Sequence, residues 1–161
     1  GMDAPADAWI VFFVVGLVSI AMSGVVVSLP TVPPPDTNAA GNAIDEVAGS
    51  SYGGTVEYEH DAEEVQLSPK EFGLKNTGGA THKSISFGTM TPVGASDDQR
   101  LRSVLDGNPW QDVFDDEQAF LATVEGAKQT AARQDDWRPA SGTLRAKTIF
   151  VGGERVTLVE F

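Results

Sequence analysis

The chain has 161 residues, which is enough for one domain or for one domain with an appendage. Its net charge of −12 argues against nucleic acid as a partner, because phosphate binding requires clustered cations. Cysteine is absent, which excludes disulfide bonds and thiolate metal sites.

Residues 8–29 form a long apolar run without a single charged side chain. Thirteen of them are Leu, Ile, Val or Phe, and together these contribute about −4 to −8 kcal/mol toward membrane insertion. The run is long enough to cross a bilayer as a helix. A buried core helix and a retained secretory signal are the alternatives. A signal has a shorter apolar stretch that follows basic residues, so a membrane-spanning or filament-core helix is favoured.

All 11 Lys and Arg residues lie at or after Lys70, so the apolar run has no basic flank to orient it. Two explanations fit. A basic leader has been removed and Gly1 is the mature terminus, or Gly1 is an added residue before a native Met2. In both cases we expect the acidic part of the chain to lie outside the cytoplasm.

A connector follows the apolar run. Pro30 ends the helix because proline cannot continue its hydrogen-bond ladder. Residues 30–42 contain three adjacent prolines and predict a stiff, extended linker of polyproline II geometry. Residues 43–52 then predict a short helix that stops at Gly53-Gly54.

The next segments alternate as strands do. We expect short strands over 55–59, 65–67 and 71–75, a turn at 76–79, and a strand over 80–88 with Ile85 and Phe87 on one face.

Two helices and a hairpin complete the predicted elements. Ser96 is expected to cap a helix over 97–106 with Leu101, Val104 and Leu105 facing inward, and Asp115 to cap a second helix over 116–133. The apolar stripe of the second helix is Phe120, Leu121 and Val124. Residues 142–151 and 154–161 flank Gly152-Gly153, a strong hairpin signal.

The sequence thus predicts an α+β fold. Residues 1–29 form the hydrophobic helix, 30–42 the linker and 43–161 an acidic extracellular domain. That domain is expected to hold one antiparallel sheet of about five or six strands with two or three short helices.

No segment predicts a catalytic, cofactor or metal site. His60 and His82 lack metal-ligand spacing, and the acidic run 59–64 lacks the oxygen pattern of a calcium loop. Trp110 and Trp137 lie near prolines and are interpreted as packing anchors, with ligand platforms as the alternative. We therefore expect neither enzymatic activity nor a cofactor.

Small residues recur along the apolar run at helical spacing. Small side chains let helix backbones approach closely in an apolar medium, which favours helix–helix assembly. The expected assembly positions are Gly16, Ser19, Ser23, Gly24 and Ser28. The alternative is that small residues are common in membrane helices.

The layout resembles an archaeal type IV pilin-like subunit, because an apolar helix from Trp9 to Leu29 precedes a globular domain with little sequence before it. The resemblance implies that a prepilin peptidase removes a leader and that the pilus assembly machinery bundles the helices into a filament core. An acid near the mature terminus, here Asp3 or Asp7, would pair with the amine of a neighbour. The chain departs from the class at position 5, which is Pro5 where many pilins carry an acid.

The chain is also similar to an uncharacterised haloarchaeal family. The acidic excess with few lysines suits a halophilic source, since the Debye length falls to ~3 Å at 1 M salt; an ordinary acidic domain is the alternative. The recurring pieces of the family are DAPADAW, VSLPTVPPPD, FGLKNTGGATH, FGTMTPVG, WRPASG and GGERVTLVEF.

These observations predict a structural subunit, a pilin, of an extracellular pilus-like filament. It would be anchored in the membrane before assembly, and its chief partner would be other copies of itself. One alternative is a membrane-anchored cell-surface domain that binds a ligand or partner. Another is a minor pilin of a filament built from a different subunit.

Overall fold

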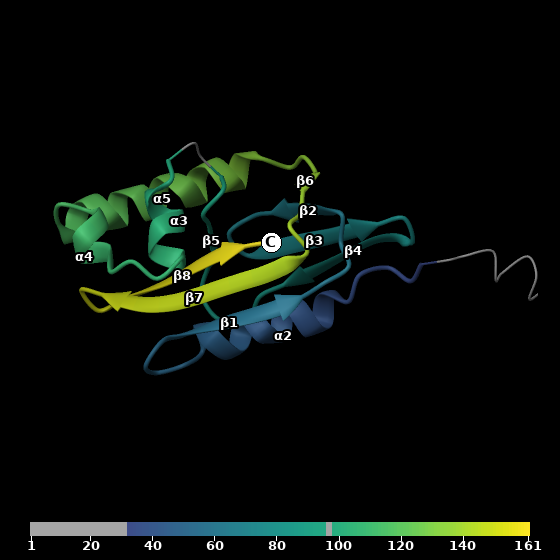
Figure 1. Cartoon of the computed structure of the whole chain (residues 1–161), viewed down its shortest axis with the longest axis horizontal. Coiled ribbons are helices and arrows are strands. Elements are labelled where there is room, and N and C mark those ends of the chain that lie inside the picture. The colour runs from purple at the N-terminus through teal and green to yellow at the C-terminus, as the bar shows by residue number, and fades with distance from the viewer. Residues whose placement is uncertain (1–31, 96–97) are drawn as a thin grey trace, which may run out of the picture. The chain divides into compact units, whose positions relative to one another are not determined.

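In the computed structural model, residues 32–95 and 98–161 are described. The chain divides into two compact units, residues 1–33 and 34–161. The second unit is an α+β domain, which confirms the predicted fold class. Its elements, drawn in Figure 1, are α2 (Thr37–Ala48), β1 (Gly54–Glu59), β2 (Glu64–Leu67), β3 (Glu71–Asn76), β4 (Gly79–Ser84), β5 (Thr91–Pro92), α3 (Arg100–Leu105), α4 (Trp110–Val113), α5 (Glu117–Arg133), β6 (Arg138–Pro139), β7 (Thr143–Val151) and β8 (Glu154–Glu160).

The strands form two four-stranded sheets rather than the single sheet predicted. The first sheet has the order β1-β7-β8-β5 and the second has the order β4-β3-β2-β6. The pair β5–β8 is parallel, which corrects the expectation of a wholly antiparallel arrangement. The strands β5 and β6 have two residues each, which is too short for an alternating pattern to be recognised in the sequence. Strand β6 is an edge strand of the second sheet and pairs with β2.

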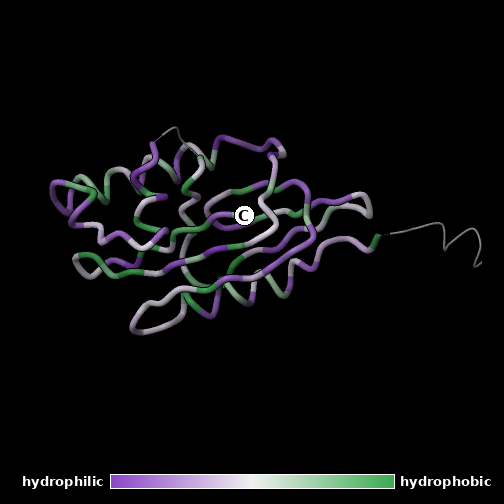
Figure 2. The backbone as a smooth tube through the Cα atoms, viewed as in Figure 1, coloured by the Kyte–Doolittle hydropathy of each residue, from purple (hydrophilic) through white to green (hydrophobic). Residues whose placement is uncertain are grey.

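The first sheet is covered on both faces. Along β7 and β8 the side chains alternate between two hydrophobic clusters. One cluster lies between this sheet, α2 and the second sheet, and includes Ile44, Phe72 and Leu144. The other lies between this sheet and α3, α4 and α5, and includes Phe120 and Leu158. In Figure 1 the two sets of helices lie on opposite sides of the β7–β8 hairpin, and Figure 2 shows hydrophobic and hydrophilic residues interleaved along the strands.

The hairpin itself is as predicted. Strands β7 and β8 pair antiparallel from Arg145↔Glu160 to Val151↔Glu154. The turn residues Gly152 and Gly153 both have positive φ, 58° and 81°. Two consecutive left-handed residues are what a tight hairpin turn demands, and glycine adopts that conformation without steric cost.

The first helix begins earlier than predicted. It spans Thr37–Ala48 instead of 43–52, so residues 37–42 of the expected linker are helical. Asp36 caps the helix because its side chain accepts a hydrogen bond from the Ala39 amide at 3.1 Å. Ala40, Ile44 and Val47 then bury one helical face in the core, which decides where the helix lies.

Other boundaries differ from the prediction as well. Strand β4 ends at Ser84 and not at residue 88, because its pairing with β3 stops at Glu71↔Ser84. As a result Ile85 packs on the core while Phe87 is exposed. Helix α3 is shorter than 97–106 and starts after Gln99, and Ser96 lies outside the described residues.

The cap of α5 is Asp116, not Asp115. Its carboxylate accepts a hydrogen bond from the Ala119 amide at 2.7 Å. Helix α5 ends at Arg133 as expected, and its buried face is Phe120, Val124, Ala127 and Ala131. Leu121 is partly buried against the same cluster.

Candidate functional site

The predicted assembly and charge-pairing residues lie outside the part of the chain that the structure describes. The same holds for the predicted apolar helix over 8–29. Within residues 32–95 and 98–161 no helix is long and apolar enough to cross a membrane. The residues concerned are Asp3, Asp7, Gly16, Ser19, Ser23, Gly24 and Ser28.

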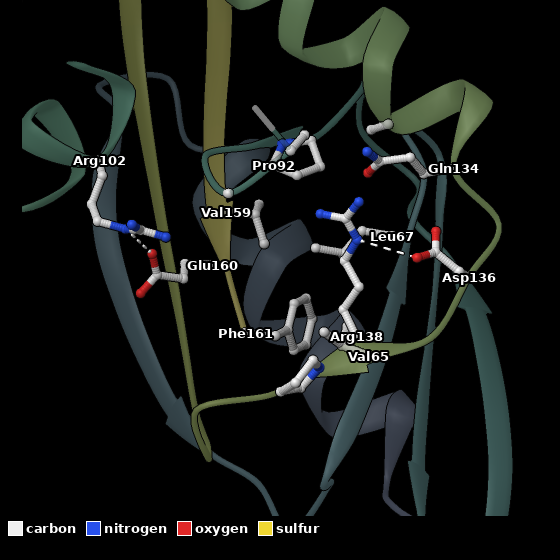
Figure 3. A pocket seen from close by; sticks show the side chains of 14 residues that line it. Val65, Leu67, Pro92, Arg102, Gln134, Asp136, Arg138, Val159, Glu160 and Phe161 are labelled. Atoms are coloured by element: carbon white, nitrogen blue, oxygen red, sulfur yellow. Dashed lines mark hydrogen bonds and ion pairs between the residues drawn. The ribbon is translucent and has the colours of Figure 1, made fainter. Parts of the chain in front are cut away.

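One cavity within the domain is a pocket of about 280 Å³. Both sheets and the end of α5 contribute to its lining. The apolar wall consists of side chains from β2, β5 and β8, most of them buried, and Figure 3 shows them facing the same space. Its main members are Val65, Leu67, Pro92, Val159 and Phe161.

Phe161 anchors this wall. Its ring lies 5.1 Å from that of Phe72 and 5.7 Å from that of His60, measured between centroids. The side chain is 5% exposed. Because the ring is held from two sides, the apolar wall is a fixed surface.

One charged border of the pocket is an ion-pair network. Arg102 Nε donates to Glu160 Oε2 at 2.7 Å, and Arg145 donates to Glu160 Oε1 at 3.1 Å and to Asp106 Oδ1 at 2.6 Å. The hydrogen bond to Asp106, followed by that to Glu160, raises the pKa of Arg145. Lys147 adds a hydrogen bond from Nζ to the Val104 carbonyl at the end of α3. This network fastens α3 to β7 and β8.

The opposite border is a single, looser ion pair. Arg138 Nε lies 3.6 Å from Asp136 Oδ2. Within the described residues the Arg138 guanidinium makes no hydrogen bond, and in Figure 3 it extends into the space between Asp136, Leu67 and Val159. Gln134 completes this side of the lining.

The two histidines have separate surroundings. His60 accepts a hydrogen bond at Nδ1 from the Ala62 amide at 3.1 Å, while Nε2 is buried and has no hydrogen-bond partner among the described residues. Burial lowers the pKa of His60, and the nearby charge of Asp61 opposes that shift. His82 is exposed and lies 3.1 Å from Gln66 Oε1.

The acidic run 59–64 is divided among different contacts. Asp61 accepts a hydrogen bond from Asn76 at 3.4 Å, and Glu64 pairs with Lys75 at 3.7 Å. Among the described residues no group of three or more His, Asp or Glu side chains is placed to hold a metal ion.

Trp110 and Trp137 both make packing contacts, as interpreted from the sequence. Trp110 stacks on Phe120 with the ring centroids 5.6 Å apart. Trp137 meets the edge of His82 at 5.6 Å and lies under the Lys75 ammonium at 5.4 Å. Its neighbours Asp136 and Arg138 line the pocket, and this role was not recognised in the sequence. The only local sequence feature at this part of the pocket is an arginine between a tryptophan and a proline.

Chemically, the pocket suits binding. Apolar walls with a few convergent polar groups are typical of small-molecule sites. The fold and the pocket together define an α+β domain with a ligand-sized cavity lined by both of its sheets.

The chain belongs to DUF7283, a family of unknown function, whose model matches residues 3–149. The match extends from the acidic terminus through the apolar run into β7. This confirms the resemblance to an uncharacterised family. No curated protein and no solved structure matches the chain.

Proposed function

We propose that the protein is a pilin, a structural subunit of an extracellular type IV pilus-like filament that assembles through its N-terminal apolar segment. The observation that carries the proposal is the charge-free run at 8–29, which requires lipid or other apolar helices around it. A second compact unit follows from Pro34 onward. The proposal assigns no enzymatic activity and no cofactor to the chain.

The start of the domain supports this organisation. Pro35 is buried, and its carbonyl accepts a hydrogen bond from Thr81 Oγ1 at 2.8 Å. Pro34 lies beside Gly79, and Asp36 caps α2. The chain is therefore packed against the domain from Pro34 onward. Only residues 30–33 separate the domain from the apolar run in the sequence. A connection this short suits domains displayed close around a filament core.

The assembly route follows from the resemblance to archaeal pilins. The subunit would reside in the membrane before assembly, with a prepilin peptidase and the assembly machinery as partners. Asp3 or Asp7 would pair with the terminal amine of a neighbouring copy. The excess of acidic groups would keep the displayed domains soluble at high salt.

A second candidate function is a membrane-anchored cell-surface domain that binds a ligand. The pocket around Phe161 and Arg138 favours it, because a purely structural subunit has no need of a ligand-sized cavity. A minor pilin that initiates a filament of another subunit combines both functions.

Substitutions on the small-residue face test the filament proposal. Ser19→Ile adds bulk to the face shared by Gly16 and Ser23, whereas Val18→Phe adds bulk at least about 80° around a helix from every predicted assembly position. Both variants keep the segment apolar. We expect Ser19→Ile to reduce filament yield strongly in electron micrographs of cell surfaces and Val18→Phe to leave it near wild type. Equal yields from both variants would count against assembly through this face, and anchored monomers from the unmodified chain would support the second candidate.

A further inference from the structure

We propose that the pocket between the two sheets binds a small monocarboxylate with an apolar body, and that Arg138 holds the carboxylate. The residues involved all lie within 65–161, so the proposal stands or falls separately from filament assembly. It names a ligand class for a site that neither the sequence patterns nor the family membership assigns.

Arg138 is the available cation of this pocket. Arginine carries five N–H donors in a planar fork that matches a carboxylate. Its only ion pair within the described residues is the 3.6 Å approach of Nε to Asp136, whose side chain is 63% exposed. The guanidinium can therefore donate to an incoming ligand without first breaking a hydrogen bond.

Arg102, which also lines the pocket, is in a different state. Its guanidinium donates to Glu160 at 2.7 Å and to Gln99 at 2.7 Å. A ligand that recruited Arg102 would have to replace the strong bond to Glu160. The comparison assigns carboxylate binding to Arg138.

The walls select an apolar body. The apolar side chains of Val65, Leu67 and Phe161 line one side of the cavity. Burying apolar ligand surface against them is favourable at about 25 cal/mol per Å². The volume of about 280 Å³ equals roughly nine water volumes at ~30 Å³ each, so the ligand has about eight to ten non-hydrogen atoms.

The remaining charges select against multiply charged anions. Asp136 and Glu160 lie on the two borders of the pocket, and the whole protein carries a net charge of −12. A single carboxylate can occupy the field of Arg138, while a dianion would also meet the repulsion of these acids. Inorganic phosphate is therefore a weaker ligand than an apolar monocarboxylate of similar reach.

The test uses the full chain in lipid nanodiscs, with empty nanodiscs as the blank, and measures binding by isothermal titration calorimetry. The probes are phenylacetate, its neutral isostere phenylacetamide, and inorganic phosphate. We expect phenylacetate to bind with a Kd of ~0.1–1 mM and both other probes to bind at least about tenfold more weakly. Equal binding of acid and amide, tighter binding of phosphate, or no binding of phenylacetate at about ten times that concentration would overturn the proposal.

Three variants localise the site. Arg138→Gln should weaken the binding of phenylacetate at least about tenfold and leave the binding of phenylacetamide unchanged. Asp136→Asn should strengthen phenylacetate a few-fold because it removes the competing carboxylate, and it guards against a merely unfolded Arg138→Gln protein. Arg155→Gln is the matched control, since Arg155 lies over Phe150 away from the pocket. Unchanged affinity in Arg138→Gln, or weaker affinity in Asp136→Asn, contradicts the assignment.

Discussion

Thr81 and Pro35 join the start of the domain to its second sheet: Thr81 Oγ1 donates to the Pro35 carbonyl at 2.8 Å. The two residues are 46 positions apart in the sequence. The contact places the last proline of the PPP run against β4, immediately before the cap of α2. This hydrogen bond holds the end of the proline-rich segment against the domain.

Removing this hydroxyl should loosen the entry. We expect Thr81→Val to lower the free energy of unfolding by about 1 kcal/mol, because the carbonyl of the buried Pro35 loses its donor. Urea denaturation followed by tryptophan fluorescence measures the change. Thr130→Val is the control, since the Thr130 hydroxyl donates to the Gly126 carbonyl within its own helix. A Thr81→Val protein as stable as wild type would mean that the entry is not held by this bond.

A pair of hydroxyl groups is buried within the first sheet. Thr148 and Thr157 are each 1% exposed, and their Oγ1 atoms are 2.9 Å apart. Thr157→Val should cost about 1–3 kcal/mol, because it leaves the Thr148 hydroxyl buried without its partner. The double variant Thr148→Val/Thr157→Val should recover most of that loss. A double-mutant cycle in urea measures the coupling, and simple additivity of the two single changes would contradict a direct bond.

The cap of α5 offers a comparison between adjacent residues. Asp116→Ala should destabilise the domain by about 1 kcal/mol, since it removes the acceptor of the Ala119 amide. Asp115→Ala should change stability by much less. Thermal unfolding of both variants by circular dichroism checks the order. A larger loss of stability in Asp115→Ala than in Asp116→Ala would show that Asp115 is the cap, as the sequence predicted.

His60 should make stability depend on pH. Burial lowers its pKa in the folded state below the ordinary value of 6.5, so the unfolded chain binds the proton more readily. The contribution of His60 to the free energy of unfolding is fully present above pH 6.5. It decreases as the pH falls toward the pKa of the folded state and is lost below that pKa.

His60→Asn is the matched variant, because Asn Oδ1 can still accept from the Ala62 amide. Between about pH 7.5 and about pH 5.5 the wild type should lose more stability than His60→Asn in urea denaturation. The other titratable groups are the same in both proteins, so the difference between the two curves reports His60 together with its neighbour Asp61. Parallel stability curves would show that His60 titrates alike in the folded and unfolded chains.

Local patterns predicted much of this fold. Alternation located β1, β2 and β3, and the Gly152-Gly153 signal located the hairpin of β7 and β8. The helical stripe containing Phe120 and Val124 located α5. Each of these elements is recognisable because its own side chains alternate or recur at the period of the structure.

The errors arose where tertiary contacts decided the structure. The residues TNAAGN resemble a loop, yet Ala40 packs in the core and extends α2 back to Thr37. β5 and β6 consist of two residues each, and their pairing depends on β8 and β2. The pocket gathers Val65, Arg138 and Phe161 from distant parts of the chain, so no local pattern could predict it.

Electron cryo-microscopy of surface filaments sheared from native cells tests the central claim most directly. The account predicts a filament whose side-chain density reads as this sequence, with residues 8–29 bundled in the core and residues 34–161 displayed outside. Filaments built entirely from other chains, with this protein recovered only as a monomer, would contradict it.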